Sequence, residues 1–341
     1  NRTCLSLQMG QRCYNCPSKA AMPLNDAHFG GSFSSSNGQS MEYTKPPLSY
    51  ESQADLLLER GMVAERDLLI ERLSRVSYYR LSGYWHPFKD KDTDLFRGGV
   101  DFETVWRRYT FDRRFRLLVL DAIERVEVHL RSRLAHELSC LQGPFGYEDA
   151  ANLPGLTREG HAAFIEKAEA SFNRSKEQFA RHYRSKYSDS HPLPPYWALV
   201  ETFDFGTTSK LFGACPKAVQ SAIAAELGVK VPVLRSWIQT INTVRNVCAH
   251  HSRLWNRVLG FKPKIPAGDS RWTHARIRND KVYVVLALLR QLLRAIAPQS
   301  DWEGRLKGLL REYPDIPLRS MGFPEDWETS ELRAQDGSGC C

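Results

Sequence analysis

The sequence lacks the features of a membrane-spanning or secreted protein. The longest apolar run among its 341 residues is Val282–Leu289, much shorter than the roughly 20 residues that a membrane-spanning helix needs. Residues 1–40 contain no continuous apolar stretch behind a basic start, which a signal peptide would require. We therefore expect a soluble protein of the cytoplasm that has no membrane partner.

The eight cysteines match neither a disulfide framework nor a zinc site. Cys140, Cys215 and Cys248 lie in the body of the chain, and the others lie in its two terminal segments. Three widely spaced cysteines do not make a disulfide framework, and they fit a reducing compartment. Cys13 and Cys16 have half of a zinc-ribbon spacing without a second pair, so we predict no metal and no other cofactor.

Composition divides the chain into four segments. Residues 1–40 begin with Asn, include a stretch rich in Gly and Ser, and are expected to be disordered or non-native, with Met41 as the native start. Residues 41–100 are predicted to form a small helical element rich in aromatic side chains, and residues 101–325 a larger helical domain. Residues 326–341 are expected to be a disordered tail.

The hydrophobic periodicity of the body is helical. Asp101 is predicted to cap a long helix that runs to about Leu138, because its apolar residues step by three or four positions along one face. These residues are Val119, Ile123, Val126, Leu130 and Leu134. Further helices are predicted over residues 49–61, 65–76, 157–187, 197–212, 216–228, 232–251 and 280–296, with an aromatic connector over Tyr78–Trp85. The predicted fold class is therefore all-α, a bundle of long helices with a small N-terminal helical element.

Net charge gives a weaker indication of function. The chain has 47 Lys and Arg against 39 Asp and Glu, a formal net charge of +8. Hydrophobic residues make up 42% of the sequence, which excludes a globally disordered chain. The positive balance is compatible with a polyanionic partner but does not establish one. Local arrangements of residues must decide the function.

One stretch, Asn242–Arg257, brings an arginine, an amide and two imidazoles together near the end of a predicted helix. Asn246 and His250 are four residues apart and share a helix face. Arg245 and His250 are five residues apart, which is about 140° around an ideal helix. These two side chains can meet if the helix ends or distorts, or if two antiparallel copies face each other across a groove.

This combination suits metal-independent RNA cleavage, in which the RNA 2′-hydroxyl attacks its own phosphodiester. Imidazole transfers protons near neutral pH, and a guanidinium neutralises two oxygens of the crowded phosphorane. The sequence contains no Gly-rich P-loop, no HExxH and no GxSxG pattern that would indicate another chemistry. A structural role, in which Arg245 and His250 stabilise the last helical turn, stays open at this point.

The same residues resemble a known family. The segment Arg245–Arg257, RNVCAHHSRLWNR, is similar to the signature of the Abi-like (abortive infection, AbiD/AbiF type) family of the HEPN superfamily. Phe111–Arg113 and Pro194–Trp197 also match in the expected order, and the resemblance covers about residues 43–325. It implies a HEPN helical bundle, a homodimer with a composite active site, and an RNA-cleaving toxin of anti-phage defence.

The resemblance also implies roles for individual residues. Arg245 and His250 match the two defining positions of the Arg-x4-His motif, and Asn246 is the polar residue beside the arginine. His251 also satisfies the motif spacing, so either imidazole can be the principal proton-transfer group. Apart from the resemblance, Glu201 is a candidate supporting partner of the motif. The residues expected to contact RNA are Arg113, Arg125, Arg253, Asn256 and Arg257, and the last three could instead pack the dimer.

Two other functions stay open. A non-catalytic RNA-binding or RNA-sensing module of a defence or toxin–antitoxin system would hold a structured RNA, such as an antitoxin RNA, without cleaving it. A protein-interaction role would use the histidines to pack a dimer. For an RNase we expect the surplus positive charge to concentrate beside the motif. The sequence does not determine the RNA target, the cleavage specificity or the trigger.

Overall fold

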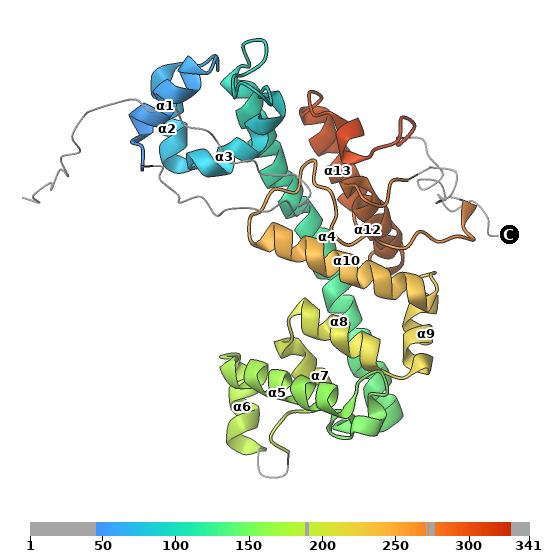
Figure 1. The fold of residues 1–341 in the computed structure, drawn as a ribbon. Coiled ribbons are helices and arrows are strands. Elements are labelled where there is room, and N and C mark those ends of the chain that lie inside the picture. The colour runs from blue at the N-terminus through green and yellow to red at the C-terminus, as the bar shows by residue number, and fades with distance from the viewer. Residues whose placement is uncertain (1–45, 188–190, 271, 273–276, 329–341) are drawn as a thin grey trace, which may run out of the picture. The chain divides into compact units, whose positions relative to one another are not determined.

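The computed structural model is α-helical throughout its described part. The described residues are 46–187, 191–270, 272 and 277–328. They contain three isolated β-bridges and no β-strand, so the predicted all-α fold class is confirmed for this part of the chain (Figure 1). The expectations for residues 1–40 and for the end of the chain after residue 328 lie outside the described residues.

The chain forms two compact units, which meet in sequence between Glu103 and Thr104. The first unit contains α1 (Tyr50–Glu59), α2 (Arg66–Arg75) and α3 (Tyr78–Trp85). The Ser49 hydroxyl caps α1 by accepting the backbone N–H of Ser52 at 3.2 Å. The apolar side chains buried in this unit include Leu57, Leu69, Leu73, Leu81 and Trp85.

The prediction of an aromatic connector over Tyr78–Trp85 is wrong, because this segment is helix α3. Aromatic residues and Gly83 have modest helix propensity, and that is why the segment was not predicted as a helix. The Ser77 hydroxyl caps its first turn, and Tyr84 and Trp85 are 1% exposed. Burial of these large side chains outweighs the small propensity deficit.

Helix α4 (Phe102–Gln142) dominates the second unit with 41 residues. A helix of this length extends roughly 60 Å. Its predicted inner face is confirmed, since the predicted residues are all buried. They are Val119, Ile123, Val126, Leu130 and Leu134. The shorter helices of the second unit pack along it (Figure 1).

The single helix predicted over residues 157–187 is two helices, α5 (Arg158–Arg174) and α6 (Gln178–Lys186). The guanidinium of Arg184 turns back across the break and donates to the carbonyl oxygens of Phe172 and Ser175 at 2.8 and 3.0 Å. These bonds satisfy carbonyl groups at the end of α5 that have no helical partner. The break is therefore fixed by a contact that the local pattern does not reveal.

The helix predicted over residues 197–212 is also interrupted. It comprises α7 (Tyr196–Leu199), a 3-10 turn and α8 (Phe205–Ala214). Asp204 starts α8, because its carboxylate accepts the backbone N–H of Thr207 at 2.6 Å and the Thr207 hydroxyl at 2.8 Å. The carboxylate cap begins a new helix at this point.

The remaining helices complete the bundle around α4. They are α9 (Lys217–Glu226), α10 (Val231–Ala249), α12 (Val282–Ile296) and α13 (Trp302–Glu312). Short 3-10 helices cover His86–Phe88, Gly146–Glu148, Ala150–Asn152, Val200–Thr202 and Leu318–Met321. Helix α10 packs against α8, α9 and α12 through buried side chains that include Trp237, Ile241 and Val244. Within the described residues, none of the helices combines the length and the apolar character that a membrane crossing requires.

Candidate functional site

The motif predicted from the sequence lies at the C-terminal end of α10. The helix ends at Ala249, and His250 is its C-cap residue with φ −84°. The next residue, His251, has φ 57°, in the left-handed region. Its N–H donates to the Cys248 carbonyl at 3.0 Å, and the Ser252 N–H donates to the Val247 carbonyl at 2.9 Å. These two bonds form a Schellman motif, which satisfies the last carbonyls of the helix.

The left-handed position of this motif is normally occupied by glycine, because a Cβ atom is unfavourable there. The chain places His251 at it. Asparagine, aspartate and histidine tolerate this conformation better than other residues, at a cost of about 1 kcal/mol or more. His250 and His251 are therefore separated by a sharp change of backbone conformation, although they are adjacent in sequence.

The polar face of α10 that carries the motif is open to solvent. Gln239, Thr243, Asn246 and His250 follow one another at helical spacing, and all four are exposed. His251 is exposed as well. The predicted sharing of a face by Asn246 and His250 is consistent with this arrangement. The motif therefore presents its amide and imidazoles on a surface.

Arg245 is half-buried and meets a carboxylate of α4. Its Nε atom is 4.0 Å from Glu127 Oε2, and the two side chains are 37% and 11% exposed. Glu127 also forms a very short ion pair with Arg131, four residues further along α4. Arg131 donates in turn to the carbonyl oxygen of Phe203. The motif arginine is thus held by a network that joins α10, α4 and the segment before α8.

The charge state of Glu127 is set mainly by burial. Burial raises the pKa of this carboxyl group, and the nearby positive charges of Arg131 and Arg245 oppose the rise. Asp204 and Glu124 add to it through like-charge repulsion. Sequence reasoning proposed Glu201 as the supporting carboxylate, but the carboxylate beside Arg245 is that of Glu127, and Glu201 is exposed.

A second carboxylate of α4 anchors the chain that follows the motif. Asp112 is completely buried, and its Oδ1 atom accepts the backbone N–H groups of Leu254 and Trp255 at 3.1 and 2.6 Å. Its Oδ2 atom pairs with Arg116, which is also buried. Phe111–Arg113 resembles the family sequence, but no local pattern indicates this role for Asp112. The backbone after α10 is therefore tied to α4.

Three of the expected RNA-contact residues lie on this anchored segment. The Arg253 guanidinium is 5.8 Å from the centre of the Trp255 ring, and Arg257 donates to the Arg253 carbonyl at 3.0 Å. Asn256 adopts a left-handed conformation with φ 52°. Arg253, Asn256 and Arg257 are half-buried, so each presents part of its side chain to solvent.

The other two expected RNA-contact residues lie on α4 in different environments. Arg113 is exposed and directly follows the buried Asp112. Arg125 is half-buried and lies 3.6 Å from the carboxylate of Asp121, which Arg305 of α13 also contacts. Arg113 is thus more available to a phosphate than Arg125 is. Contacts of these residues with RNA stay a prediction.

Comparison with known families identifies the chain. A family model described as "Abi-like protein" matches residues 71–256, which is more than half of the sequence. The chain belongs to the Abi-like family. The resemblance seen in the sequence is thereby confirmed, and membership points to a function in abortive infection. No curated protein and no solved structure matches the chain.

The matched residues include Asp112 and Glu127 of α4 and the motif as far as Asn256. The match begins within α2 and ends at Asn256, so Asp112, Glu127, Arg245 and His250 all belong to the Abi-like region. The chain has residues beyond it, among them α12 and α13. The site described above therefore lies within the part of the chain that defines the family.

One cysteine of this Abi-like site has a structural role. Cys248 is 1% exposed, and burial raises the pKa of its thiol to about 12. It is therefore a buried side chain of small volume and a poor nucleophile. Within the described residues, no His, Cys, Asp or Glu side chains are grouped in threes as metal ligands would be.

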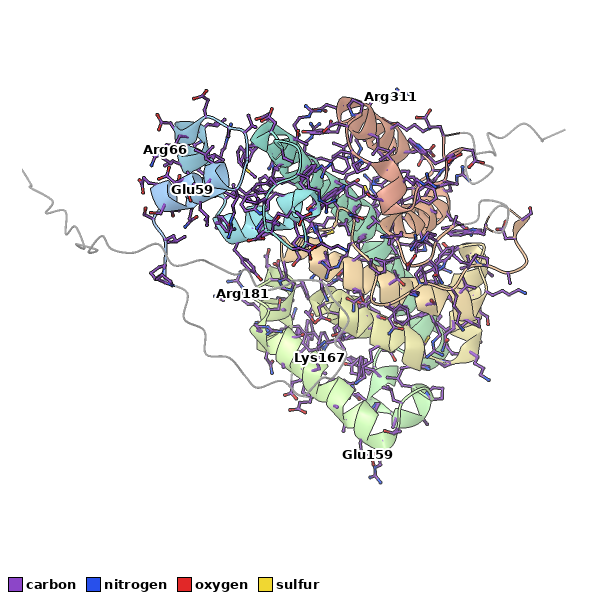
Figure 2. The ribbon with its side chains drawn as sticks, turned by 45° about the horizontal axis from the view of Figure 1, so that its top comes forward. Glu59, Arg66, Glu159, Lys167, Arg181 and Arg311 are labelled. Atoms are coloured by element: carbon purple, nitrogen blue, oxygen red, sulfur yellow. The ribbon has the colours of Figure 1, made fainter. Side chains whose placement is uncertain are left out.

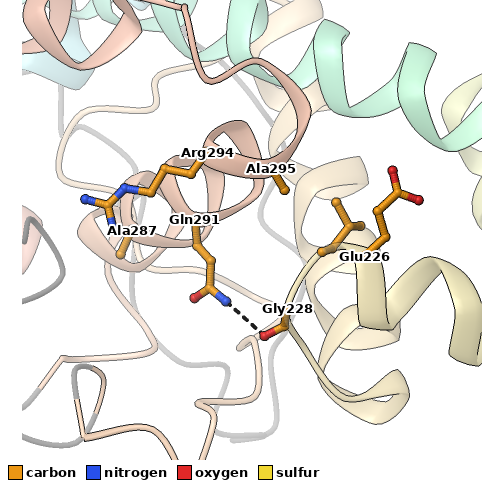
Figure 3. A pocket seen from close by; sticks show the side chains of 7 residues that line it. Glu226, Gly228, Ala287, Gln291, Arg294 and Ala295 are labelled. Atoms are coloured by element: carbon orange, nitrogen blue, oxygen red, sulfur yellow. Dashed lines mark hydrogen bonds between the residues drawn. The ribbon is translucent and has the colours of Figure 1, made fainter. Parts of the chain in front are cut away.

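A pocket of about 270 Å³ lies elsewhere in the second unit of this Abi-like protein. It opens between the end of α9 and α12, where Gln291 donates to the Gly228 carbonyl at 3.4 Å (Figure 3). Glu226 and Arg294 also line it, and no motif residue does. The motif and this hollow are therefore separate features of the surface.

Proposed function

We propose that this Abi-like protein is a metal-independent endoribonuclease of the HEPN type, which acts as an RNA-cleaving toxin in abortive-infection defence. The observation that carries the proposal is the end of α10. It presents Asn246 and His250 to solvent, while Glu127 of α4 contacts the half-buried Arg245 on another side of the same helix end. A base, an amide and a cation are the groups that this reaction requires.

In the proposed reaction the RNA 2′-oxygen forms a bond to the adjacent phosphorus, and the bond from phosphorus to the 5′-oxygen breaks. His250 takes the proton from the 2′-hydroxyl, and an imidazolium group gives a proton to the departing 5′-oxygen. Arg245 stabilises the negatively charged phosphorane, and Asn246 positions the phosphate. The products carry a 2′,3′-cyclic phosphate and a 5′-hydroxyl group. No metal ion takes part in these steps.

The proposal includes a homodimer. The motif of a single chain is an exposed half-site, and Arg245 and His250 lie five residues apart, on different sides of the helix. Two antiparallel copies of α10 would bring two motifs to one groove, so that one imidazole acts as base and another as acid. His251 is the alternative to His250 for either role. The site would operate in the cytoplasm on single RNA strands or on loops.

The test is RNA cleavage in EDTA by wild-type protein, Arg245→Ala and His250→Ala. We expect wild type to cleave, each variant to lose about 10²- to 10⁴-fold in rate, and the products to carry cyclic phosphate ends. Arg311→Ala serves as the control, because Arg311 is an exposed arginine of α13. Cleavage that survives both motif substitutions, or that requires Mg²⁺, would contradict the proposal.

The same experiment separates the alternative function. Wild-type protein that binds RNA with a steep salt dependence and never cleaves it would be an RNA-binding or RNA-sensing module, with an antitoxin RNA among its candidate ligands. Mass measurement in solution tests the dimer. A protein that cleaves RNA as a monomer would contradict the composite site and leave the cleavage chemistry standing.

A further inference from the structure

Positive charge gathers at a second place in the chain, at the end of α5 and along α6. Residues 174–187 contain one acidic residue, Glu177. Their basic residues are Arg174, Lys176, Arg181, Arg184 and Lys186. This segment is outside the motif, whereas the sequence predicted a concentration of charge beside it. Positive charges this close together in the sequence repel one another, so their concentration suggests a functional role.

Helix α6 is held in place by one of its faces. Ala180 is buried, and the Tyr183 hydroxyl donates to the carbonyl oxygens of His191 and Leu193 at 3.2 and 3.0 Å. Arg184 is half-buried, donates to two carbonyls at the end of α5, and lies 5.1 Å from the centre of the Phe172 ring. These contacts position the helix, so Arg184 is not part of the free positive charge.

The exposed side of α6, together with the end of α5 and the residues between the two helices, is basic. Arg174, Lys176, Arg181 and Lys186 are all exposed, and in the described part of the chain they form no ion pair with an acidic side chain. Figure 2 shows Arg181 on α6 and Lys167 on the neighbouring helix α5. Helix α4 differs, because most of its arginines pair with carboxylates. The cations of α6 are therefore available to an anionic partner.

Aromatic side chains lie among these cations. Phe179, His182 and Lys186 follow one another at positions i, i+3 and i+7, so they share the exposed face. Phe179 is 37% exposed and Tyr187 is 50% exposed. The Lys186 ammonium group is 5.2 Å from the centre of the Tyr187 ring. Cations that alternate with exposed rings match the backbone phosphates and unstacked bases of a single RNA strand.

Charged residues of α5, α4 and α10 lie between the two regions. Lys167 of α5 lies 3.1 Å from the carboxylate of Asp204, and Asp204 is one of the charges that act on Glu127. Glu127 in turn meets Arg245. In Figures 1 and 2, α6 and the C-terminal end of α10 lie on the same side of the second unit.

We propose that this face of α6 binds single-stranded RNA and holds it for cleavage at the end of α10. The α6 face is defined by Arg174, Lys176, Phe179, Arg181, Lys186 and Tyr187. The second half of this statement rests on the proposed function, whereas the first half does not. An anionic membrane is the weaker partner, because α6 has nine residues and no apolar face exposed for insertion.

The test measures RNA binding in a His250→Ala background, so that cleavage does not interfere. The variant is Lys176→Gln/Arg181→Gln/Lys186→Gln, and the control is Lys217→Gln/Lys230→Gln/Arg311→Gln, which removes three exposed cations elsewhere. The probe is a fluorescent oligouridine of about 20 nucleotides. We expect the variant to bind at least tenfold more weakly at 0.1 M salt than the control, with a salt slope lower by about 2.

A second pair of variants tests the stacking part of the proposal. Phe179→Ala and Tyr187→Ala each remove one ring and no charge. We expect roughly five- to a hundredfold weaker binding of oligouridine and an unchanged salt slope. Thermal unfolding should be the same as in the parent protein, because Tyr183 and Arg184 still hold α6. Equal binding by the charge variant and its control would overturn the proposal.

Two further outcomes keep this proposal apart from the proposed function. If wild-type protein does not cleave RNA but the α6 variants lose binding, the α6 face is still an RNA surface and the nuclease proposal fails. If the wild type cleaves a dinucleotide and a long RNA, and the α6 variants cleave both equally well, the α6 proposal fails alone. Binding of the parent to anionic phospholipid vesicles but not to oligouridine would also overturn it.

Discussion

Asp112 and Glu127 form the same kind of local ion pair but make different tertiary contacts. Both are carboxylates on α4, and each pairs with an arginine four residues later, Arg116 or Arg131. Asp112 adds two backbone N–H groups of the segment after the motif and is completely buried. Glu127 adds a longer contact, 4.0 Å, to the half-buried Arg245. The same local pair thus serves two different tertiary contacts.

Asp112 anchors the backbone, whereas Glu127 positions a functional side chain. Asp112 satisfies backbone donors that have no helical partner, and such bonds cannot be replaced by water once they are buried. Glu127 holds a guanidinium whose second function is to meet a phosphate. A longer, partly exposed contact leaves Arg245 free to adjust. We therefore expect substitutions at Asp112 to act on folding and substitutions at Glu127 to act on the reaction.

The largest expected effect is that of Asp112→Ala. It removes a buried charge and leaves Arg116 and two backbone N–H groups without their acceptor, so we expect a loss of about 3–5 kcal/mol in the free energy of unfolding. Urea denaturation measures it. Asp121→Ala is the control, because Asp121 pairs with Arg125 on the same helix and with Arg305 of α13 but is partly exposed, and it should cost less than about 1 kcal/mol.

Thiol labelling gives a second readout of the same variant. Cys248 lies beside Asp112, and burial raises the pKa of its thiol to about 12, so it should resist thiol reagents in the folded wild type. The exposed Cys140 should react. In Asp112→Ala we expect Cys248 to become reactive. Continued protection, together with unchanged stability, would show that Asp112 does not anchor the segment after the motif.

A smaller effect, on activity, is expected for Glu127→Gln. The amide keeps the shape of the side chain but holds Arg245 less firmly, so we expect kcat/KM for RNA cleavage to fall about tenfold. The free energy of unfolding should change by about 1 kcal/mol or less, because burial opposes the charge of Glu127. Glu137→Gln is the control, since Glu137 pairs with Arg133 on α4 away from the motif. If Glu127→Gln lost as much stability as Asp112→Ala, the two carboxylates would both act on folding and the proposed difference between them would be wrong.

The pH dependence of stability offers a third comparison. Burial raises the pKa of Glu127 above its ordinary value of 4.5, so the folded state binds this proton more tightly than the unfolded state. The contribution of Glu127 to stability is therefore full below pH 4.5 and declines as the pH rises through the raised pKa. Urea unfolding from pH 4 to 8 should show this decline in wild type relative to Glu127→Gln. A relative gain with pH would contradict the raised pKa.

The smallest expected effect concerns the cap of α10. His251→Gly removes an unfavourable left-handed conformation, and we expect it to raise the free energy of unfolding by about 0.5–1 kcal/mol relative to His251→Ala. Both variants lack the imidazole, so rates that are equal in the two and lower than the wild-type rate would show that activity depends on that group and not on the cap. Cleavage at the wild-type rate would assign proton transfer to His250 alone.

The sequence predicted the helices whose signals are local. The spacing of Val119, Ile123 and Val126 predicted the buried face of α4, and the position of the motif at the end of α10 followed from the run before it. The sequence does not reveal the roles of Asp112 and Glu127, because a carboxylate four residues before an arginine is typical of an ordinary surface ion pair. Their decisive partners lie more than a hundred residues away in the sequence, so no local pattern reveals them.

The errors within helices have the same cause. The break between α5 and α6 is stabilised by Arg184, whose side chain reaches back to Phe172, and the start of α8 depends on the carboxylate of Asp204. Helix α3 is stabilised by the burial of Trp85. In each case a tertiary contact or a cap outweighs the propensity of the segment. The role of Arg245 was inferred from its neighbours, but its carboxylate partner required the structure.

The unbroken length of α4 has a consequence for how the family can vary. Between Asp112 and Glu127 the helix rises roughly 22 Å, and one inserted residue would turn everything beyond it by about 100°. Such an insertion would move Glu127 away from Arg245 while Asp112 kept its place. We therefore expect Abi-like relatives to differ between these two positions by substitution and almost never in length. Insertions should accumulate in the connections between helices instead.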